Sequence, residues 1–293
     1  YELQRVIDRC KEIETDLKTF LTQSAPGFVY WVETESNARK RAVLRSAPLH
    51  VGPSVRTCLL EHYESVVLTS ATLSSGPAEA GGFDFFAGRI GLEEYQSLQV
   101  GSPFDYARQV RLYIEANLPD PNSADFVRQA AGAIQKYLLK SEGRAFVLFT
   151  SYAMLRRFAD TLREWVAEQQ MELLVQGQGL DRARMLAAFQ SLPRCVLFGT
   201  DSFWQGVDVP GEKLSNVIIV RLPFAVPGHP LIQGRIEQLK EEGINPFYGY
   251  QVPMAILKFK QGFGRLIRRK TDCGIVAVLD SRILHKSYGR LFL

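Results

Sequence analysis

The sequence predicts an α/β fold in which helices flank a mostly parallel sheet. From about residue 80, short apolar runs alternate with longer amphipathic runs, which is typical of strands joined by helical crossovers. The apolar runs are nearly continuous, as in residues 216–220, and this indicates strands that are buried on both faces. No internal repeat or low-complexity tract interrupts the alternation.

Before residue 80 the pattern predicts fewer strands. Residues 1 to about 22 carry apolar side chains at helical spacing, and the break at 24–27 ends that helix. Short strands are expected at 28–32, 42–46 and 66–69, with a helix at about 54–63. Three strands are too few for a complete sheet domain, so we interpret residues 1–75 as the trailing part of one domain. The Gly- and Pro-rich stretch 76–88 is the predicted linker.

The second predicted domain spans residues 76–293. Its strands are expected at 97–100, 110–114, 145–150, 172–175, 195–198, 216–221 and 275–279. Its helices are expected at about 123–140, 153–169, 180–190, 229–242, 253–269 and 282–290.

Composition restricts the class of protein. The chain has 293 residues, of which 46% are hydrophobic and 23% charged, so it can bury a sizeable core. No apolar run reaches the ~18 residues of a membrane span, and no secretory leader precedes the first helix. We therefore expect a cytoplasmic protein with no membrane partner. The net charge of +4 permits a polyanionic partner without establishing one.

The cysteines and histidines predict no metal site. Cys10, Cys58, Cys195 and Cys273 are widely scattered and lack the spacing of a metal-binding pair. The four histidines likewise show no paired spacing.

Residues 261–269 read QGFGRLIRR and carry the clearest chemical signal. On a helix that begins near Pro253, the polar positions Gln261, Gly264, Arg265 and Arg268 are predicted to share one face. Gly264 would let a ligand approach closely, at about 1 kcal/mol of helix propensity relative to alanine. Two guanidinium groups suit a phosphate chain because they pair bidentately and keep their charge. The alternative is a solvated basic face.

A second motif, residues 199–211, leaves the carboxyl end of the predicted strand 195–198, the edge where α/β sheets bind ligands. Thr200 could donate its hydroxyl to a nucleic-acid phosphate, and Asp208, two residues after Gly206, could accept from a ribose. Trp204 could stack on a base, or it could anchor the core.

Taken together, these segments resemble motifs III to VI of a superfamily 2 helicase. Their sequences are most similar to those of the DinG and XPD branch. The matching segments are SATL at 70–73, VLFTSY at 147–152, FWQGVDVPG at 203–211, RLPF at 221–224 and QGFGRLIRR at 261–269. The resemblance implies that the second predicted domain is a RecA-like motor domain, preceded by a remnant of the first motor domain and its insertion helix.

The resemblance also implies roles for the candidate residues. Those assigned to catalysis, as arginine fingers for ATP hydrolysis, are Arg265 and Arg268. Those assigned to the nucleotide are Gln261, Gly264, Gly206 and Asp208. Those assigned to single-stranded nucleic acid, expected to be DNA, are Thr150, Ser151, Thr200 and Trp204. Those assigned to coupling between the motor domains are Ser70 and Thr72.

A helicase motor also needs a phosphate loop and an acidic strand end for Mg²⁺, and this sequence has neither. The segment most similar to a phosphate loop, residues 206–213, has Glu212 at the position of the lysine that such a loop requires. Because the chain also opens on Tyr1, we expect a carboxy-terminal piece that has no ATPase activity alone. ATP and Mg²⁺ would bind mainly to the upstream first motor domain. By resemblance, many members also carry an iron–sulfur cluster, whose cysteines would lie upstream, and the parent would be a 5′ to 3′ DNA helicase in repair or in resolving blocked replication.

Two other classes remain open. An α/β interaction module could keep the fold without the chemistry, but it has no need for two arginines beside Gly264. A Rossmann-type transferase would need a glycine-rich turn after its first strand and an acidic residue about 20 positions later, and the sequence lacks that arrangement.

Overall fold

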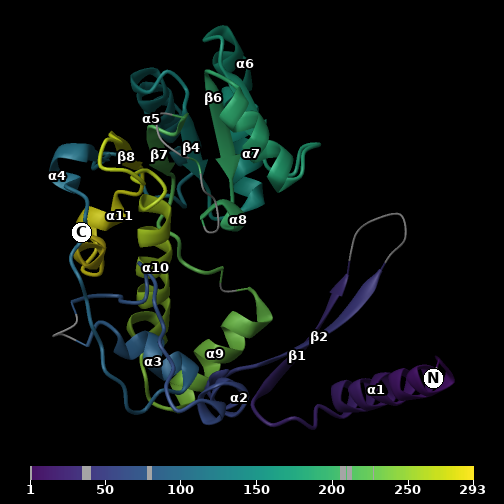
Figure 1. Cartoon of the computed structure of the whole chain (residues 1–293). Helices are drawn as coiled ribbons and strands as arrows, with labels where there is room; N and C mark the ends of the chain where they lie inside the picture. The colour runs from purple at the N-terminus through teal and green to yellow at the C-terminus, as the bar shows by residue number, and fades with distance from the viewer. Residues whose placement is uncertain (1, 35–40, 78–80, 205–208, 210–212, 227) are drawn as a thin grey trace. The chain divides into compact units, whose positions relative to one another are not determined.

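The computed structural model describes residues 2–34, 41–77, 81–204, 209, 213–226 and 228–293 (Figure 1). The chain forms two compact units. Unit 1 comprises Tyr1–Thr69, Gly81–Ser97 and Val226–Tyr250, and unit 2 comprises Ser70–Ala80, Leu98–Ala225 and Gln251–Leu293. This division differs from the predicted boundary at residues 75 and 76, because two later segments join unit 1 and the segment after Thr69 joins unit 2.

Unit 2 is built on a six-stranded sheet in the order β3-β8-β7-β4-β6-β5, with every neighbouring pair parallel. The strands are β3 (Val110–Ile114), β4 (Ala145–Leu148), β5 (Glu172–Val175), β6 (Cys195–Gly199), β7 (Asn216–Ile219) and β8 (Gly274–Val278). The predicted α/β fold with a mostly parallel sheet is confirmed.

Helices precede, connect and follow these strands. They are α4 (Tyr106–Gln109), α5 (Phe126–Lys140), α6 (Tyr152–Glu168), α7 (Arg182–Ser191), α8 (Asp201–Trp204), α10 (Val252–Phe263), α11 (Arg282–His285) and the 3₁₀ turn η5 (Gly289–Phe292). Side chains cap the N-termini of several of these helices. Ser151 accepts a hydrogen bond from the backbone nitrogen of Met154 at the start of α6, and Asp181 does the same for Arg184 at the start of α7.

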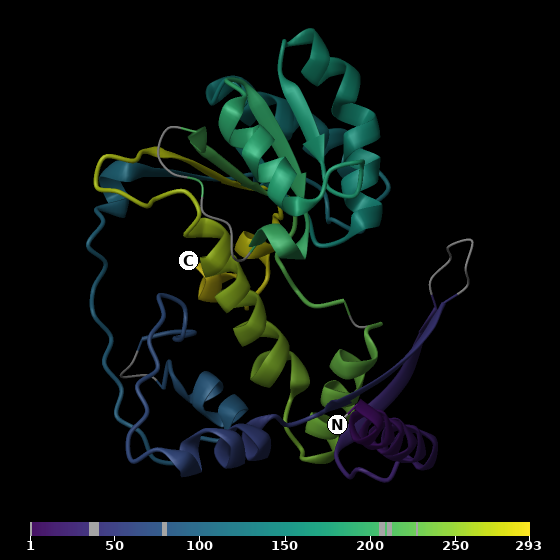
Figure 2. The same cartoon turned by 45° about the vertical axis from the view of Figure 1, so that its right-hand side comes forward.

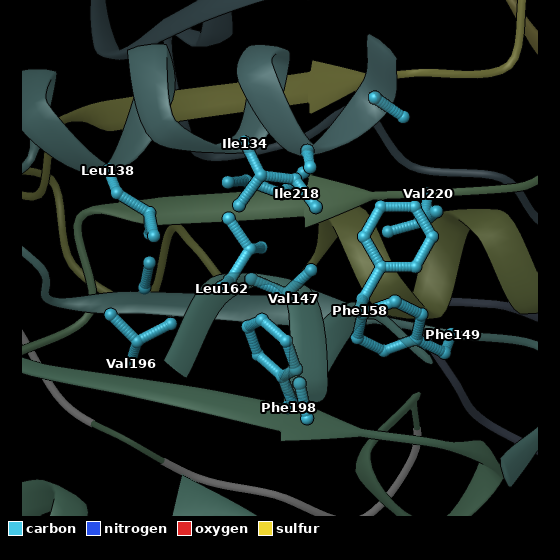
Figure 3. Packing of buried hydrophobic residues seen from close by; sticks show 14 of the residues in the cluster. Ile134, Leu138, Val147, Phe149, Phe158, Leu162, Val196, Phe198, Ile218 and Val220 are labelled. Carbon is cyan, nitrogen blue, oxygen red and sulfur yellow. The ribbon is translucent and has the colours of Figure 1, made fainter. Parts of the chain in front are cut away.

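The core lies on both faces of this sheet. On one face, α5 and α6 pack Ile134, Leu138, Phe158 and Leu162 onto alternate strand residues (Figure 3). Those strand residues, on or directly after their strands, are Val147, Phe149, Val196, Phe198, Ile218 and Val220. On the other face Phe146 contacts the ring of Phe189 in α7, with the centroids 4.7 Å apart. The period of two along β4 therefore divides its side chains between two helical layers.

Unit 1 combines several helices with two strands (Figure 2). They are α1 (Glu2–Thr22), β1 (Phe28–Thr34), β2 (Ala42–Pro48), α2 (Gly52–Cys58), the 3₁₀ turn η1 (Leu60–His62), α3 (Asp84–Ile90) and α9 (Pro230–Glu241), with the π-helix η4 (Phe247–Gln251) at the boundary. Strands β1 and β2 form an antiparallel pair. Gly234 of α9 lies against Val29 so closely that an added Cβ atom would come within 2.6 Å of the Val29 side chain.

Several predicted elements are wrong. Residues 66–69 and 97–100 form no strand, and their apolar side chains Val67, Leu98 and Val100 are exposed, because no other described strand pairs with them. The short helices α3, α4 and α8 were not predicted. The predicted helix 253–269 ends at Phe263. Within the described residues, no helix combines the length and apolar character needed to cross a membrane.

Candidate nucleotide and nucleic-acid sites

The arginines predicted to share a helix face lie beyond the end of α10. Gly264 is the C-terminal cap of this helix, and its N–H donates to the Lys260 carbonyl. The half-buried Arg265 side chain turns back, and its Nε donates to the carbonyls of Gln261 (3.1 Å) and Trp204 (3.3 Å). Arg268 is exposed in the loop that follows. The prediction of one continuous polar face is therefore wrong, because the helix ends at the glycine that was expected to lie inside it.

Two residues that sequence reasoning missed hold the loop that carries Arg268. The Asp272 carboxylate accepts hydrogen bonds from the backbone nitrogens of Arg268 (2.9 Å) and Arg269 (2.8 Å). Gln109 donates from Nε2 to the carbonyls of Arg269, Lys270 and Asp272. Both side chains are buried. Gln109 lies far upstream in the sequence, so no local pattern could have identified it.

The segment from Ser70 to Ser74 lies against α10 within unit 2. The side-chain nitrogen of Gln261 is 3.5 Å from the Thr72 hydroxyl, which is itself 3.4 Å from that of Ser70. Lys260 donates to the Ser74 carbonyl at 3.1 Å, and burial lowers the pKa of this lysine. Gln261 Oε1 is buried and has no hydrogen-bond partner in the described structure. Ser70, Thr72 and Gln261 are thus brought together, as neighbours in one compact unit.

Trp204 is part of the core. Its side chain is 0% exposed, and its indole nitrogen donates to the Phe149 carbonyl at 3.1 Å. Gly262 of α10 packs so tightly on the ring that an added Cβ atom would come within 2.8 Å of it. The prediction that Trp204 stacks on a base is contradicted, because no face of the ring is accessible.

Polar residues gather where the central strands end. Thr200, directly after β6, is 4% exposed, and its backbone nitrogen and hydroxyl both donate to Gln176 Oε1, at 2.7 and 2.9 Å. Its predicted phosphate contact is contradicted, because the hydroxyl is buried and already paired. Thr150 and Ser151 are half-buried after β4, and Ser151 also caps α6. Gln176 was missed, although a polar residue directly after a predicted strand is a usable signal.

Gly206 and Asp208 lie outside the described residues. Among the residues that the structure describes, no group of three or more His, Cys, Asp and Glu side chains is arranged to hold a metal ion. The four cysteines form no disulfide, and Cys195 alone is buried.

Three kinds of comparison place these motifs among known proteins. The family model described as the helicase C-terminal domain matches residues 134–293, more than half of the chain. Two solved XPD helicase structures superpose with TM-scores of 0.67 and 0.66 at 18% identity, covering 95% and 97% of this chain and 48% and 56% of theirs. At that identity the likeness shows the fold.

Curated relatives extend the similarity over nearly the whole chain. It is 36% identical to the ATP-dependent DNA helicase YoaA of Escherichia coli, over 99% of this chain and 44% of that protein. It is 38% identical to the ATP-dependent helicase DinG of Mycobacterium tuberculosis H37Ra, over 95% of this chain and 42% of the relative. It is 35% identical to a Bacillus subtilis protein named 3′-5′ exonuclease DinG, over 90% of this chain and 29% of that protein. The chain spans less than half the length of these relatives, and it belongs to the helicase C-terminal domain family.

Proposed function

We propose that this chain acts as the second motor domain of an ATP-dependent DNA helicase. The observation that carries the proposal is the group formed by Gln261, Thr72 and Arg265 at the end of α10, with Arg268 on the loop that follows. A buried acceptor without a partner is costly unless a ligand or a water molecule satisfies it. Gln261 Oε1 is such an acceptor.

The group is suited to the γ-phosphate side of a nucleotide. Phosphate oxygens accept hydrogen bonds, so Arg265 and Arg268 would bind them, whereas Gln261 Oε1 would accept from the water molecule that attacks the phosphorus. ATP would supply the phosphoryl group, and the first motor domain would hold Mg²⁺. Positive charge placed there by another domain stabilises the transition state and contributes about 10³ to 10⁵ in rate.

Gly264, Gly206 and Asp208 remain proposed nucleotide contacts, the last two on the ribose side. Thr72 contacts Gln261 of α10 in this structure and Ser70 contacts Thr72, and we propose that these two residues relay the state of the nucleotide between the motor domains. Because the arginines and the phosphate loop would stand on different domains, ATP would draw the domains together and hydrolysis would release them.

Single-stranded DNA would lie along the carboxyl edge of the sheet, next to Thr150 and Ser151. The start of α6 presents backbone N–H groups to an anion at that edge. Contacts of this kind go to phosphates, so binding should be nearly independent of base sequence.

The proposal is tested by Arg268→Ala and Arg265→Ala in a polypeptide that carries both motor domains. We expect the turnover number to fall at least about 100-fold, with single-strand affinity in the absence of nucleotide retained. Arg269→Ala is the matched control, because Arg269 is the exposed neighbour of Arg268 and has no assigned role. Parallel loss of DNA binding and ATPase activity would instead identify the arginines as strand contacts.

The 293-residue chain should fold and show no ATP hydrolysis by itself, because the phosphate loop is absent from its sequence. DNA-stimulated turnover that co-purifies with the chain and survives a control for contaminants would contradict the assignment.

A further inference from the structure

The side-chain amide of Gln176 joins the loops that follow three neighbouring strands. Gln176 itself follows β5, Tyr152 begins the helix after β4, and Ser202 lies in α8 after β6. Gln176 Nε2 lies 2.7 Å from the Tyr152 hydroxyl and 2.9 Å from the Ser202 hydroxyl. Its Oε1 receives both hydrogen bonds from Thr200. Two donor hydrogens and two acceptor lone pairs are therefore all in use.

The orientation of this amide is determined by its surroundings. The backbone nitrogen of Thr200 can only donate, so the atom that it faces must be the amide oxygen. The amide nitrogen must then face Tyr152 and Ser202, and it donates to both of their hydroxyl oxygens. Each hydroxyl proton is consequently left to point away from Gln176.

Neither proton meets an acceptor among the residues that the structure describes. Among the described residues, the Tyr152 and Ser202 hydroxyls donate no hydrogen bond. Tyr152 is 46% exposed, and Ser202 is also exposed. The two hydroxyls are neighbours, because both contact one nitrogen atom. The Thr200 hydroxyl is oriented the other way, because it donates its proton to Gln176 Oε1.

We propose that Tyr152 and Ser202 donate their hydroxyl protons to backbone phosphates of single-stranded nucleic acid, and that Gln176 is the positioning residue that turns both protons outward. Phosphate oxygens only accept, so an outward-facing pair of donors suits them. The assignment rests on the proposed function. It replaces the buried Thr200 and Trp204 with two exposed residues, Ser202 on the same segment after β6 and Tyr152 after the neighbouring strand β4.

The test is single-strand binding by the 293-residue chain, measured by fluorescence anisotropy with a labelled oligothymidine. We expect Tyr152→Phe and Ser202→Ala each to weaken binding about five-fold. The slope of affinity against salt should stay unchanged, because no cation is removed.

Gln176→Glu tests the positioning role. A carboxylate still accepts from Thr200, but it cannot donate, so both hydroxyls would turn inward to donate to it. In the Gln176→Glu background, Tyr152→Phe should then cost less than about two-fold. Taking the ratio within one background cancels the effect of the added charge. Gln178→Glu is the matched control, because it adds the same charge two residues away and should leave the full cost of Tyr152→Phe.

The outcomes separate the two proposals. If the parental chain does not bind the strand, both the donor pair and the proposed function fail. If it binds, but neither single variant changes the affinity, only the donor pair is wrong. An equal cost of Tyr152→Phe in the parental and Gln176→Glu backgrounds would remove the positioning role of Gln176, and a thermal melt of each variant identifies any loss that comes from unfolding.

Discussion

Unit 2 and unit 1 differ sharply in how they bury apolar side chains. Among the described residues, the buried hydrophobic side chains of unit 1 are those of Ala87 and Tyr250, and all the others belong to unit 2. Helix α1 has no buried residue, and Leu3 and Leu21 on it are largely exposed. Unit 2 instead covers both faces of a parallel sheet, which is how such sheets obtain a continuous core.

The difference is consistent with where the candidate residues lie. Side chains that must hold a defined geometry are placed on rigid, well-packed elements. All of the described candidate residues, from Ser70 to Arg268, belong to unit 2. A two-stranded antiparallel pair such as β1 and β2 is too small to supply a comparable core alone. We therefore expect substitutions to be costly in unit 2 and mild in unit 1.

The largest contrast should come from two tryptophans. Trp204→Ala should lower the free energy of unfolding by about 3 to 5 kcal/mol, because it empties a fully buried site. Trp31→Ala in half-buried β1 should cost about 1 kcal/mol. Urea unfolding followed by circular dichroism measures both. Equal losses would break the comparison, and a loss of strand affinity without a loss of stability would restore the stacking role of Trp204.

Two leucines on helices sharpen the comparison. Leu162→Ala in α6 removes a side chain buried against the sheet and should cost about 2 to 5 kcal/mol. Leu17→Ala in α1 changes a side chain that is 44% exposed and should alter stability by less than about 0.5 kcal/mol. The same unfolding measurement applies. A large effect of Leu17→Ala would mean that α1 packs in solution.

A smaller contrast should separate two carboxylates. Asp272→Ala would leave the backbone nitrogens of Arg268 and Arg269 without their acceptor and should cost about 1 to 3 kcal/mol. Glu93→Ala breaks an exposed ion pair with Arg56 and should change stability by less than about 0.5 kcal/mol. If Asp272 positions the Arg268 loop, Asp272→Ala should also lower ATP turnover in a polypeptide with both motor domains, whereas Glu93→Ala should not.

Thiol labelling requires no substitution and should perturb the protein least. Burial raises the pKa of the Cys195 thiol to about 12, so this cysteine stays protonated and unreactive near pH 8. The exposed thiols of Cys10, Cys58 and Cys273 should react quickly with an aromatic disulfide reagent. Counting labelled thiols by mass spectrometry before and after denaturation checks this. Rapid labelling of Cys195 in the native chain would show that the sheet opens.

The sequence predicted the sheet well and the end of α10 poorly, for one physical reason. Apolar spacing reports which side chains are buried, and in β6 and β7 those side chains are also strand residues. After Gly264, the buried Leu266 and Ile267 continue the apolar spacing, although the backbone there has left the helix. The apolar spacing of a buried loop can therefore be the same as that of a longer helix.

The sequence by itself determined the order and type of the strands of unit 2, apart from the unformed strand at 97–100, and it placed Gln261, Arg265 and Arg268 in one motif. Local periodicity and backbone geometry are enough for that much. Only the tertiary structure decided that Trp204 is buried beneath Gly262, that Asp272 and Gln109 hold the arginine loop, and that Gln176 directs the hydroxyls beside it. Exposure and hydrogen bonding depend on which distant element covers a residue, and local spacing carries no information about that partner.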